Sequence, residues 1–387
     1  MKIPFNRPYL TGNELNYIED AIRSSQSGGH ISGDGKYTKL VQQFFETEFH
    51  ARKVLLTTSG TSALELAFHL LNLKPGDEVI LPSYTFSSTA NAVILAGGKP
   101  VFADISEETL NIDPKDIIKK ITKKTRAICP VHYGGVSCQM DEIMNIANNH
   151  NLRVVEDAAQ GVNAKYKGKY LGTVGDFGCY SFHETKNYVC GEGGALTINT
   201  EDERVIEYAE ILREKGTDRS KFFRGEVDKY TWVNIGSSFL ISDILAAFLY
   251  AQVENIDEIQ EKRLLVWNTY YNALKPFEDK GVIRLPIIPE YSQHNAHMFY
   301  VLFRNEEIRD MAMHKLKEAG IFAVFHYIPL HSAPMGQNYG YKKNDLPITE
   351  NLSGRLLRLP MYPSLQLGEV EYITNQLLNI LNLNLRS

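Results

Sequence analysis

The sequence predicts an α/β protein in which a mostly parallel, mixed sheet lies between helices and a smaller α+β domain follows. At 387 residues, the chain exceeds the ~250–300 residues at which one hydrophobic core usually stops growing. Its apolar share of 43% and charged share of 22% are those of an ordinary globular protein, which disfavours a coiled coil, a collagen and wholesale disorder. Short apolar runs alternate with helical patterns between residues 53 and 200, which is typical of βαβ units.

The runs that we expect as strands of the first domain are short and bounded by polar or turn residues. They are KVLLTT (53–58), EVILP (78–82), PVFADI (100–105), RAICPVHY (126–133) and LRVVE (152–156). Helical patterns lie between them, in TSALELAFHLLNL (61–73), TANAVILAG (89–97) and DEIMNIANNH (141–150). Parallel strands need such crossovers, so we expect helices on both faces of the sheet.

Beyond residue 201 the pattern becomes helical and then changes. ERVIEYAEILREKG (203–216) reads as a helix, and the apolar periodicity from Ser242 past Leu265 predicts a connecting helix. A different pattern follows, in which the apolar runs HMFYVLF (297–303) and FAVFHYI (322–328) alternate with helical patterns in MAMHKLKEAG (311–320) and EVEYITNQLLNILN (369–382). We therefore predict a large domain at 1–250, including the N-terminal segment and a polar loop at 217–238, and a connecting helix with a small domain at 251–387.

Charge and composition exclude several functional classes. The formal net charge is −5 and the basic residues are scattered, so there is no electrostatic footprint for nucleic acid. The start, MKIPFNRPYL, lacks the apolar stretch of a secretory signal, and four cysteines without a C-x-x-C pair fit a reducing compartment. We expect a soluble, cytoplasmic protein that does not enter a membrane.

Nucleotide and metal motifs are missing. Neither G-x-G-x-x-G nor G-x-x-x-x-G-K-[ST] occurs. The run that begins at His183-Glu184 starts like a zinc-binding helix, but Asn187 stands where the second histidine ligand is required, so no metal is expected.

A first candidate site lies where a strand gives way to a helix, in TTSGTSA at residues 57–63. Its glycine allows close backbone approach, and a helix N-terminus offers free N–H groups and a positive dipole, which suit a phosphate. An ordinary Thr/Ser helix cap without a ligand is the alternative.

Two further candidates are a carboxylate and a lysine. Asp157 ends a buried strand in VVEDAAQ, at the edge where open α/β sheets bind ligands, and could pair with a cationic ring nitrogen or simply cap a helix. Lys186 follows an apolar strand in FHETKN and precedes the glycine cluster GEGG (191–194). A desolvated lysine amine is nucleophilic and can form a Schiff base, although most lysines are surface charges.

Together these three candidates are the parts that pyridoxal 5′-phosphate (PLP) needs: an anchor for its phosphate, a partner for its pyridine nitrogen and a covalent tether. The blocks TTSGTSALELA, PSYTFSSTANA, PVHYGGVSCQMD, VVEDAAQGV, SFHETKN, GEGGA and RLPMYPSL resemble, in this order, those of the sugar nucleotide aminotransferase family. That resemblance covers nearly the whole chain. It implies the fold of the PLP-dependent transferases of fold type I, which is the fold of aspartate aminotransferase.

The resemblance also implies roles for individual residues. Lys186 would form the Schiff base with PLP and carry protons during catalysis, and Asp157 would pair with the pyridine nitrogen. The remaining cofactor contacts that it implies are Gln160 at the 3-oxygen side, Phe86 stacked on the ring, Gly60, Thr61 and Ser181 at the phosphate, and Ser238 reaching the phosphate from the second subunit. His183 would line the substrate pocket.

Within the family, the segments SFHETKNY, REKGT, RSKFFRG, DKYTW, IGSS, NAHMFY and AVFHYIPLH resemble those of the branch that makes dTDP-4-amino-4,6-dideoxygalactose. Many members have an Asn-Tyr-Arg run where this chain reads Ser238-Phe239-Leu240, and the galactose branch is similar to this chain there. The implied reaction moves the amino group of L-glutamate to C4 of dTDP-4-keto-6-deoxy-D-glucose, for surface polysaccharide biosynthesis, in a homodimer with sites at the subunit interface.

Sugar nucleotide contacts are expected from two stretches. Arg219, Arg224 and Lys229, with Tyr230 nearby, could hold the pyrophosphate, or could form a solvated charged loop. His326, Tyr327 and His331 in FHYIPLH could approach the sugar from the small domain, or could belong to its core.

Other functions stay open at this point. Transamination of a 3-keto sugar, or formation of the gluco product, would use the same catalytic set. PLP-dependent sugar dehydration replaces the tethering lysine by histidine, and Lys186 argues against it. A non-catalytic PLP or sugar nucleotide sensor is opposed by the complete catalytic set and by the missing basic patch.

Overall fold

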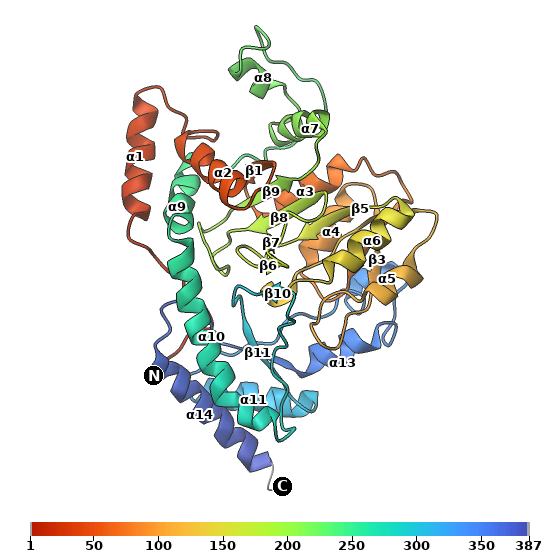
Figure 1. Cartoon of the computed structure of the whole chain (residues 1–387), viewed down its shortest axis with the longest axis vertical. Helices are drawn as coiled ribbons and strands as arrows, with labels where there is room; N and C mark the ends of the chain where they lie inside the picture. The colour runs from red at the N-terminus through yellow and green to blue at the C-terminus, as the bar shows by residue number, and fades with distance from the viewer. Residues whose placement is uncertain (1, 385–387) are drawn as a thin grey trace.

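The computed structural model describes residues 2–384, and it has the layered α/β architecture that the sequence predicts (Figure 1). A mixed sheet of seven strands runs in the order β1-β9-β8-β5-β4-β2-β3. The strands are β1 (Lys53–Thr57), β2 (Glu78–Pro82), β3 (Lys99–Ala103), β4 (Thr125–Ile128), β5 (Arg153–Asp157), β8 (Phe177–Ser181) and β9 (Gly194–Ile198). Only β9 runs antiparallel to its two neighbours.

Alternation along the strands divides the core of the large domain into two layers. Val54 and Leu56 of β1 pack with helices of one face, whereas Leu55 between them packs with helices of the other. The first face is covered by α2 (Lys36–Glu48), α6 (Met140–His150) and α9 (Asp243–Val253), and α1 (Glu14–Gln26) packs on α9. The second is covered by α3 (Gly60–Leu70), α4 (Ser87–Leu95) and α7 (Glu203–Arg213). Because both faces are covered, the strands read as continuous apolar runs.

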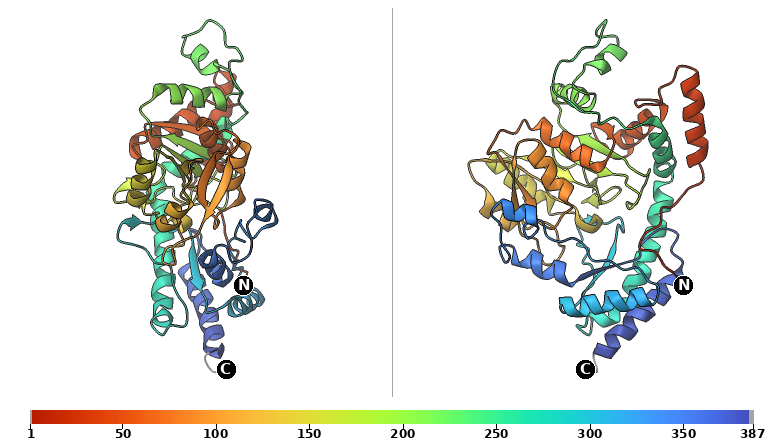
Figure 2. Two further views of the ribbon diagram at one scale, coloured as in Figure 1. Left: turned by 90° about the vertical axis from the view of Figure 1, so that its right-hand side faces the viewer. Right: turned by 180° about the vertical axis from the view of Figure 1, so that it is seen from behind.

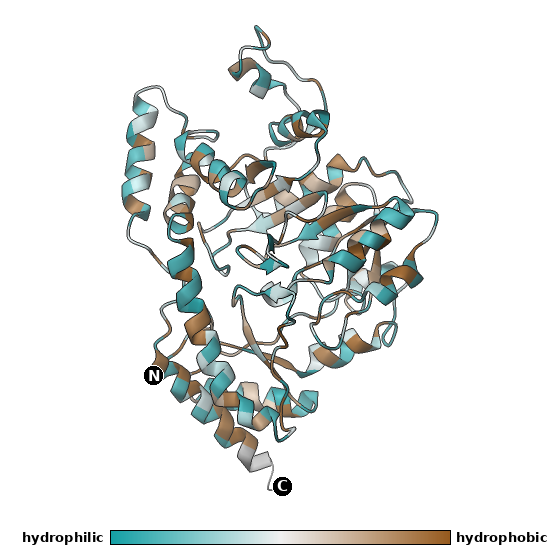
Figure 3. Cartoon of the chain, viewed as in Figure 1, coloured by the Kyte–Doolittle hydropathy of each residue, from teal (hydrophilic) through white to brown (hydrophobic). Residues whose placement is uncertain are grey.

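The expected connecting helix is two helices. α9 ends at Val253, and α10 (Ile256–Glu278) starts after a break at Glu254 and Asn255. In Figure 1 α10 descends from the large domain to the small one. Hydrophilic and hydrophobic residues alternate along α10 and α14 (Leu367–Asn384) in Figure 3, as in helices with one covered face.

The small domain is built on a two-stranded antiparallel ribbon of β11 (Phe299–Leu302) and β12 (Leu356–Leu359). α10, α11 (Glu306–Glu318) and α14 pack around it, and the short helices α12 (Pro334–Asn338) and α13 (Pro347–Arg355) lead back to β12. The run FAVFHYI forms only a single bridge, between Val324 and Arg358, rather than a strand. The strand that pairs with β11 is instead β12.

The N-terminal segment departs from the expected division of the chain. Ile3 is fully buried in the core of the small domain, its N–H donates to the carbonyl of Gly320 (2.9 Å), and it bridges Ile321. The first residues therefore pack on the second domain, although we predicted them with the first. Conversely, Asp104 of the large domain accepts hydrogen bonds from Ile348 and Thr349 of α13. In the right-hand view of Figure 2, blue helices of the small domain lie beside the orange and yellow part of the large domain.

Three minor strands and a protruding segment complete the fold. The strands β6 (Lys165–Tyr166), β7 (Lys169–Tyr170) and β10 (Ser292–Gln293) form a small sheet, and a 3-10 turn spans Tyr133–Gly135. The α5 helix (Pro114–Lys120) packs beside β3.

Residues 215–238, which include α8 (Arg219–Phe223), extend from the end of α7 away from the body at the top of Figure 1. We call this segment the arm. Among residues 2–384, no helix is long and apolar enough to cross a membrane.

Candidate active site

A cavity of about 400 Å³ opens at the carboxyl ends of the parallel strands, between the large and small domains. Residues from nearly the whole length of the chain line it. From the large domain come Ser59, Gly60, Thr61, Thr85, Phe86, Ser88, Thr89, Asp157, Ala159, Gln160, Ser181, His183, Thr185, Lys186 and Glu192, and from the small domain and N-terminal segment come Phe5, His297, His326, Tyr327 and Arg358. The three motifs that are separate in the sequence thus meet in one place.

One wall of the cavity is the N-terminus of α3. Ser59 caps this helix by accepting a hydrogen bond from the N–H of Ser62 (3.0 Å). The hydroxyls of Thr61 and Ser88 bond to each other (2.7 Å), which joins the starts of α3 and α4. A Cβ at Gly60 would lie 2.7 Å from the Cβ of Ser181, so only glycine allows this approach of helix and strand. The wall offers N–H groups, hydroxyls and a helix dipole, which together suit a phosphate.

Asp157 lies at the end of β5 and is 5% exposed. Its Oδ2 accepts a hydrogen bond from the Thr89 hydroxyl (2.7 Å), and its Oδ1 accepts one from the N–H of Ala159 (3.2 Å). Thr89 in turn bonds to the Thr85 hydroxyl (2.8 Å). This chain of hydroxyls fixes the orientation of a carboxylate that faces the cavity.

Lys186 follows β8 and lies in the cavity wall, where its backbone N–H donates to the carbonyl of His183 (2.9 Å). Burial lowers the pKa of Lys186 from its ordinary value to about 8, the charge of Arg358 lowers it too, and Asp157 acts in the opposite direction. About one tenth of the amine is therefore neutral and nucleophilic at pH 7.

A buried amide network borders Lys186. The Asn187 amide nitrogen donates to the carbonyl of Asn295 (2.8 Å), so its oxygen faces Nδ1 of His297 (2.8 Å). Nδ1 of His297 therefore carries the proton, and Nε2 is left as an acceptor. Burial lowers the pKa of His297 well below its ordinary value, which keeps the ring neutral.

Aromatic rings from both domains line the cavity, with Phe86 from the large domain and His326 and Tyr327 from the small one. Phe86 is 59% exposed, so it is not a core aromatic, and its ring lies 6.1 Å from that of Tyr327. The Tyr327 hydroxyl accepts from the Gln160 amide (3.1 Å), whose oxygen accepts from the N–H of Gly134 (2.7 Å). His326 lies against Tyr327 with ring centroids 3.5 Å apart.

Most of the residues expected at the cofactor line this cavity, namely Gly60, Thr61, Phe86, Asp157, Gln160, Ser181 and Lys186, and so do His183, His326 and Tyr327. His331 does not. It is fully buried, and its ring bonds to the Ser83 hydroxyl (2.7 Å) and to Glu350 (2.9 Å). His331 ties α13 to the large domain, so our assignment of this residue to the substrate is corrected.

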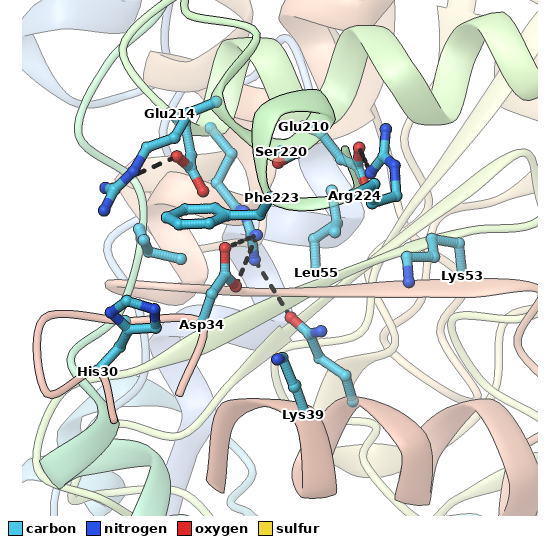
Figure 4. Close-up of a pocket in the computed structure, with 15 residues that line it drawn as sticks. His30, Asp34, Lys39, Lys53, Leu55, Glu210, Glu214, Ser220, Phe223 and Arg224 are labelled. Carbon is cyan, nitrogen blue, oxygen red and sulfur yellow. Dashed lines mark hydrogen bonds and ion pairs between the residues drawn. The ribbon is translucent and has the colours of Figure 1, made fainter. Parts of the chain in front are cut away.

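The expected pyrophosphate residues also lie elsewhere in this chain. Arg219 and Arg224 line a second cavity, of about 410 Å³, between the arm and α2 (Figure 4). Arg224 already pairs with Glu210 (2.8 Å) and Glu226 (2.6 Å). Lys229 and Tyr230 are exposed on the arm, and Ser238, also exposed, is bridged to Glu214 at its base. None of these five lines the cavity that contains Lys186.

Sequence reasoning missed Arg358, His297 and Thr89. Thr89 lies in the quoted block PSYTFSSTANA, and His297 in NAHMFY, but nothing in their spacing tied them to Asp157 or Lys186. Arg358 begins the quoted block RLPMYPSL, and the available signal was a charged residue inside the apolar strand LLRL.

Comparison with known proteins agrees with this geometry. Residues 12–378 match the DegT/DnrJ/EryC1/StrS aminotransferase family. The chain belongs to this family. The spore coat polysaccharide biosynthesis protein SpsC of Bacillus subtilis is 36% identical over 95% of this chain and 94% of its own length, and the GDP-perosamine synthase of Escherichia coli O157:H7 is 32% identical over 96% of both.

Solved structures show the same fold with the cofactor present. The PLP form of the sugar aminotransferase Spr1654 from Streptococcus pneumoniae superposes with a TM-score of 0.90 at 25% identity, over 99% of both chains. NtdA of Bacillus subtilis, with bound pyridoxamine phosphate, gives 0.86 at 31% identity, over 98% of this chain and 85% of its own. The protein is a PLP-dependent sugar aminotransferase. The residues present fit that cofactor, because Gly60 and Ser181 leave a cradle that a Cβ would fill, and Asp157 and Lys186 face one cavity.

Proposed function

We propose that the protein transfers the amino group of L-glutamate to C4 of dTDP-4-keto-6-deoxy-D-glucose, giving dTDP-4-amino-4,6-dideoxy-D-galactose and 2-oxoglutarate. The observation that carries the proposal is that Lys186, with a pKa of about 8, and the fixed carboxylate of Asp157 face one cavity. The sequence blocks shared with the galactose branch support the sugar and the configuration at C4. Relatives named for spore coat polysaccharide biosynthesis and GDP-perosamine synthesis support a nucleotide-linked sugar destined for a surface polysaccharide.

PLP, when bound, supplies an aldehyde that a lysine amine can bond and a ring that withdraws electrons from the carbon that loses a proton. Gly60, Thr61 and Ser181 would hold its phosphate, and Ser238 of a second subunit would add a contact. Asp157 would hold a proton on the ring nitrogen, Phe86 would cover the ring, and Gln160 would approach its 3-oxygen side.

Lys186 would carry the protons of both half-reactions. Once its amine is displaced by the amino donor, it is free to take the proton from Cα of glutamate, and in the second half-reaction to deliver a proton to C4 of the sugar. A lysine with its ordinary pKa would be almost wholly protonated at pH 7 and could not act as a base. The lowered pKa lets one side chain act as nucleophile, base and acid.

We propose that the working unit is a homodimer in which the arm reaches the active site of the other subunit. Large apolar side chains are exposed on the arm: Phe222, Phe223, Tyr230, Trp232, Val233 and Ile235 are between 39% and 79% exposed. Such a concentration of exposed apolar surface is typical of an interface. In that arrangement Lys229 and Tyr230 would meet the pyrophosphate of the sugar nucleotide, together with Arg219, which in the single chain lies 4.0 Å from Glu214. His183, His326 and Tyr327 would face the sugar.

We also propose a cytoplasmic location, which the four free, buried cysteines support because thiols persist in a reducing compartment. The test of function is incubation of the purified protein with L-glutamate and dTDP-4-keto-6-deoxy-D-glucose, followed by NMR. We expect one equivalent of 2-oxoglutarate per amino sugar and small H3–H4 coupling, which identifies an axial amino group at C4. Large coupling would identify the gluco product, and no product with this sugar but turnover of a 3-keto sugar would overturn the proposal.

A further inference from the structure

His297 lines the cofactor cavity together with Lys186, and the rest of the chain fixes both its backbone and its ring. The backbone is held by Arg263 of α10, which donates to the carbonyls of Ala296 (3.0 Å) and His297 (2.7 Å). Ala296 has a φ of 50°, in the left-handed region that alanine rarely adopts. Such local strain persists only where the surrounding structure imposes it, and it gathers at functional sites.

The ring of His297 is fixed by a chain of amides. The side chain of Asn295 donates to the carbonyls of Gln160 (2.8 Å) and Val162 (2.7 Å), and its backbone carbonyl accepts from the Asn187 amide. The Asn187 oxygen in turn accepts from Nδ1 of His297 (2.8 Å), which leaves Nε2 without a proton. The residue that sets this tautomer is the immediate neighbour of the lysine in the chain.

The His297 ring is neutral in this setting. Burial lowers the pKa of His297 well below its ordinary value, and the positive charges of Lys186, Arg263 and Arg358 lower it further. Nε2 therefore offers a lone pair and accepts hydrogen bonds rather than donating them.

Nε2 of His297 and Nζ of Lys186 both lack a partner. Among residues 2–384, neither atom makes a hydrogen bond or an ion pair. Besides the cofactor cavity, both residues line a smaller hollow that leaves no room for a water molecule. Since water cannot join the two groups from that side, direct contact is the arrangement that satisfies both.

The other histidines of the cavity are placed differently. Neither His183 nor His326 lines the smaller hollow. Nε2 of His183 lies 3.6 Å from Glu192, and His326 bonds through Nδ1 to a buried tyrosine hydroxyl (2.9 Å). Among the histidines that the structure describes, His297 alone shares both spaces with Lys186.

We infer that His297 is a positioning residue for Lys186: its Nε2 accepts a hydrogen bond from the lysine amine whenever that amine is not bonded to the cofactor. The inference rests on the proposed function, in which the freed amine takes and delivers protons. An acceptor at this place engages one N–H of the amine and leaves its lone pair free for a proton, whereas a donor would engage the lone pair. Holding the amine in one orientation matters, because a displacement of about 1 Å can cost about 100-fold in rate.

Two substitutions separate this role from a purely structural one. An asparagine side chain reaches the position of Nδ1 but not that of Nε2, and a glutamine side chain does the reverse. His297→Asn therefore keeps the hydrogen bond to Asn187 and loses the acceptor, whereas His297→Gln keeps the acceptor and loses that bond. The control is His314→Asn, at an exposed position of α11.

The first measurement is the conversion of the PLP-loaded protein to its pyridoxamine phosphate form by L-glutamate, followed by absorbance in a single turnover. We expect the rate constant to fall about 10- to 100-fold in His297→Asn, less than about fivefold in His297→Gln, and not at all in His314→Asn. The Kd for L-glutamate should stay within about threefold of wild type in all three. An unchanged rate in His297→Asn, a larger loss in His297→Gln, or a loss that appears only in Kd would overturn the inference.

A second measurement depends neither on activity nor on the folding of these variants. Protein labelled with nitrogen-15 histidine is loaded with added pyridoxamine phosphate, and NMR compares wild type with Lys186→Met. We expect Nε2 of His297 to be unprotonated in both and to resonate upfield in wild type, where the amine donates to it. Equal resonances, or a protonated Nε2, would overturn the inference. A wild type whose PLP does not respond to L-glutamate would instead overturn the proposed function, and the NMR comparison would still decide the inference.

Discussion

The cofactor cavity and the arm contrast in how the chain fixes their side chains. In the cavity, Asp157 ends β5 and Lys186 follows the adjacent strand β8. The Thr89 hydroxyl orients Asp157, and Asn187, next to Lys186, donates to the carbonyl of Asn295. On the arm, Arg224 pairs with its own neighbours, and Trp232 is 79% exposed. The groups that surround Asp157 and Lys186 come from one chain, whereas the arm offers apolar surface without a partner. Catalysis should therefore depend on local geometry in the first region and on assembly in the second.

The largest effect that tests this contrast is expected from Asp157→Asn. The amide keeps the shape but cannot hold a positive charge on the ring nitrogen, so we expect kcat to fall by roughly 1,000-fold while PLP stays bound. Absorbance of the bound cofactor and initial rates with L-glutamate measure both. If kcat stays within tenfold of wild type, the assigned role of Asp157 is wrong.

The next test is whether the arm forms the dimer interface. It uses the double substitution Trp232→Asp with Ile235→Asp. Two charged groups in place of apolar side chains that the proposed dimer would bury should weaken the dimer by roughly 100-fold or more, and activity should become dependent on protein concentration. Sedimentation velocity measures the dissociation.

The matched control is Leu95→Asp with Ile118→Asp, at two exposed apolar residues of the body. That variant should remain dimeric. If both double variants sediment as wild type does, the arm is not the interface, and the cavity does not need a second chain.

A smaller effect is expected from pH. Since the pKa of Lys186 is lowered to about 8, the neutral amine increases from about one tenth at pH 7 to about nine tenths at pH 9, and we expect PLP to attach to the apoprotein about tenfold faster over that range. Stopped-flow absorbance follows the reaction. A rate that keeps rising through pH 10 would show that the cavity does not lower this pKa.

The smallest expected effect belongs to Phe86→Leu. Loss of ring stacking worth about 0.5–1.5 kcal/mol should weaken PLP binding by about 2- to 10-fold and leave the dimer intact. Equilibrium dialysis of the apoprotein gives the affinity. An unchanged Kd would place the cofactor ring away from Phe86.

The sequence predicted the cavity better than its surroundings, for a physical reason. Strand ends are readable from apolar runs, and the carboxyl ends of parallel strands meet at one edge, so Thr61, Asp157 and the cavity they share could be anticipated. The place of His331 could not, because its hydrogen bonds to Ser83 and Glu350 join segments far apart in the chain.

The fold shows the same limit. The runs from KVLLTT to LRVVE became strands, since each has an apolar stretch that is buried on both faces, but RAICPVHY (126–133) forms a shorter strand than expected, with β4 ending at Ile128. The break after α9 and the return of Ile3 to the small domain depend on packing between distant segments. So does the role of β12, whose single arginine interrupts the apolar pattern that would have marked it as a strand.

The central claim is that Lys186 is the residue that bonds to PLP. Reduction of the PLP-loaded protein with borohydride, followed by proteolysis and mass spectrometry, tests it most directly. The account predicts one pyridoxyl label per chain, on the peptide that contains Lys186, and no label in Lys186→Ala. A label on another lysine, or none in the wild type, would contradict it.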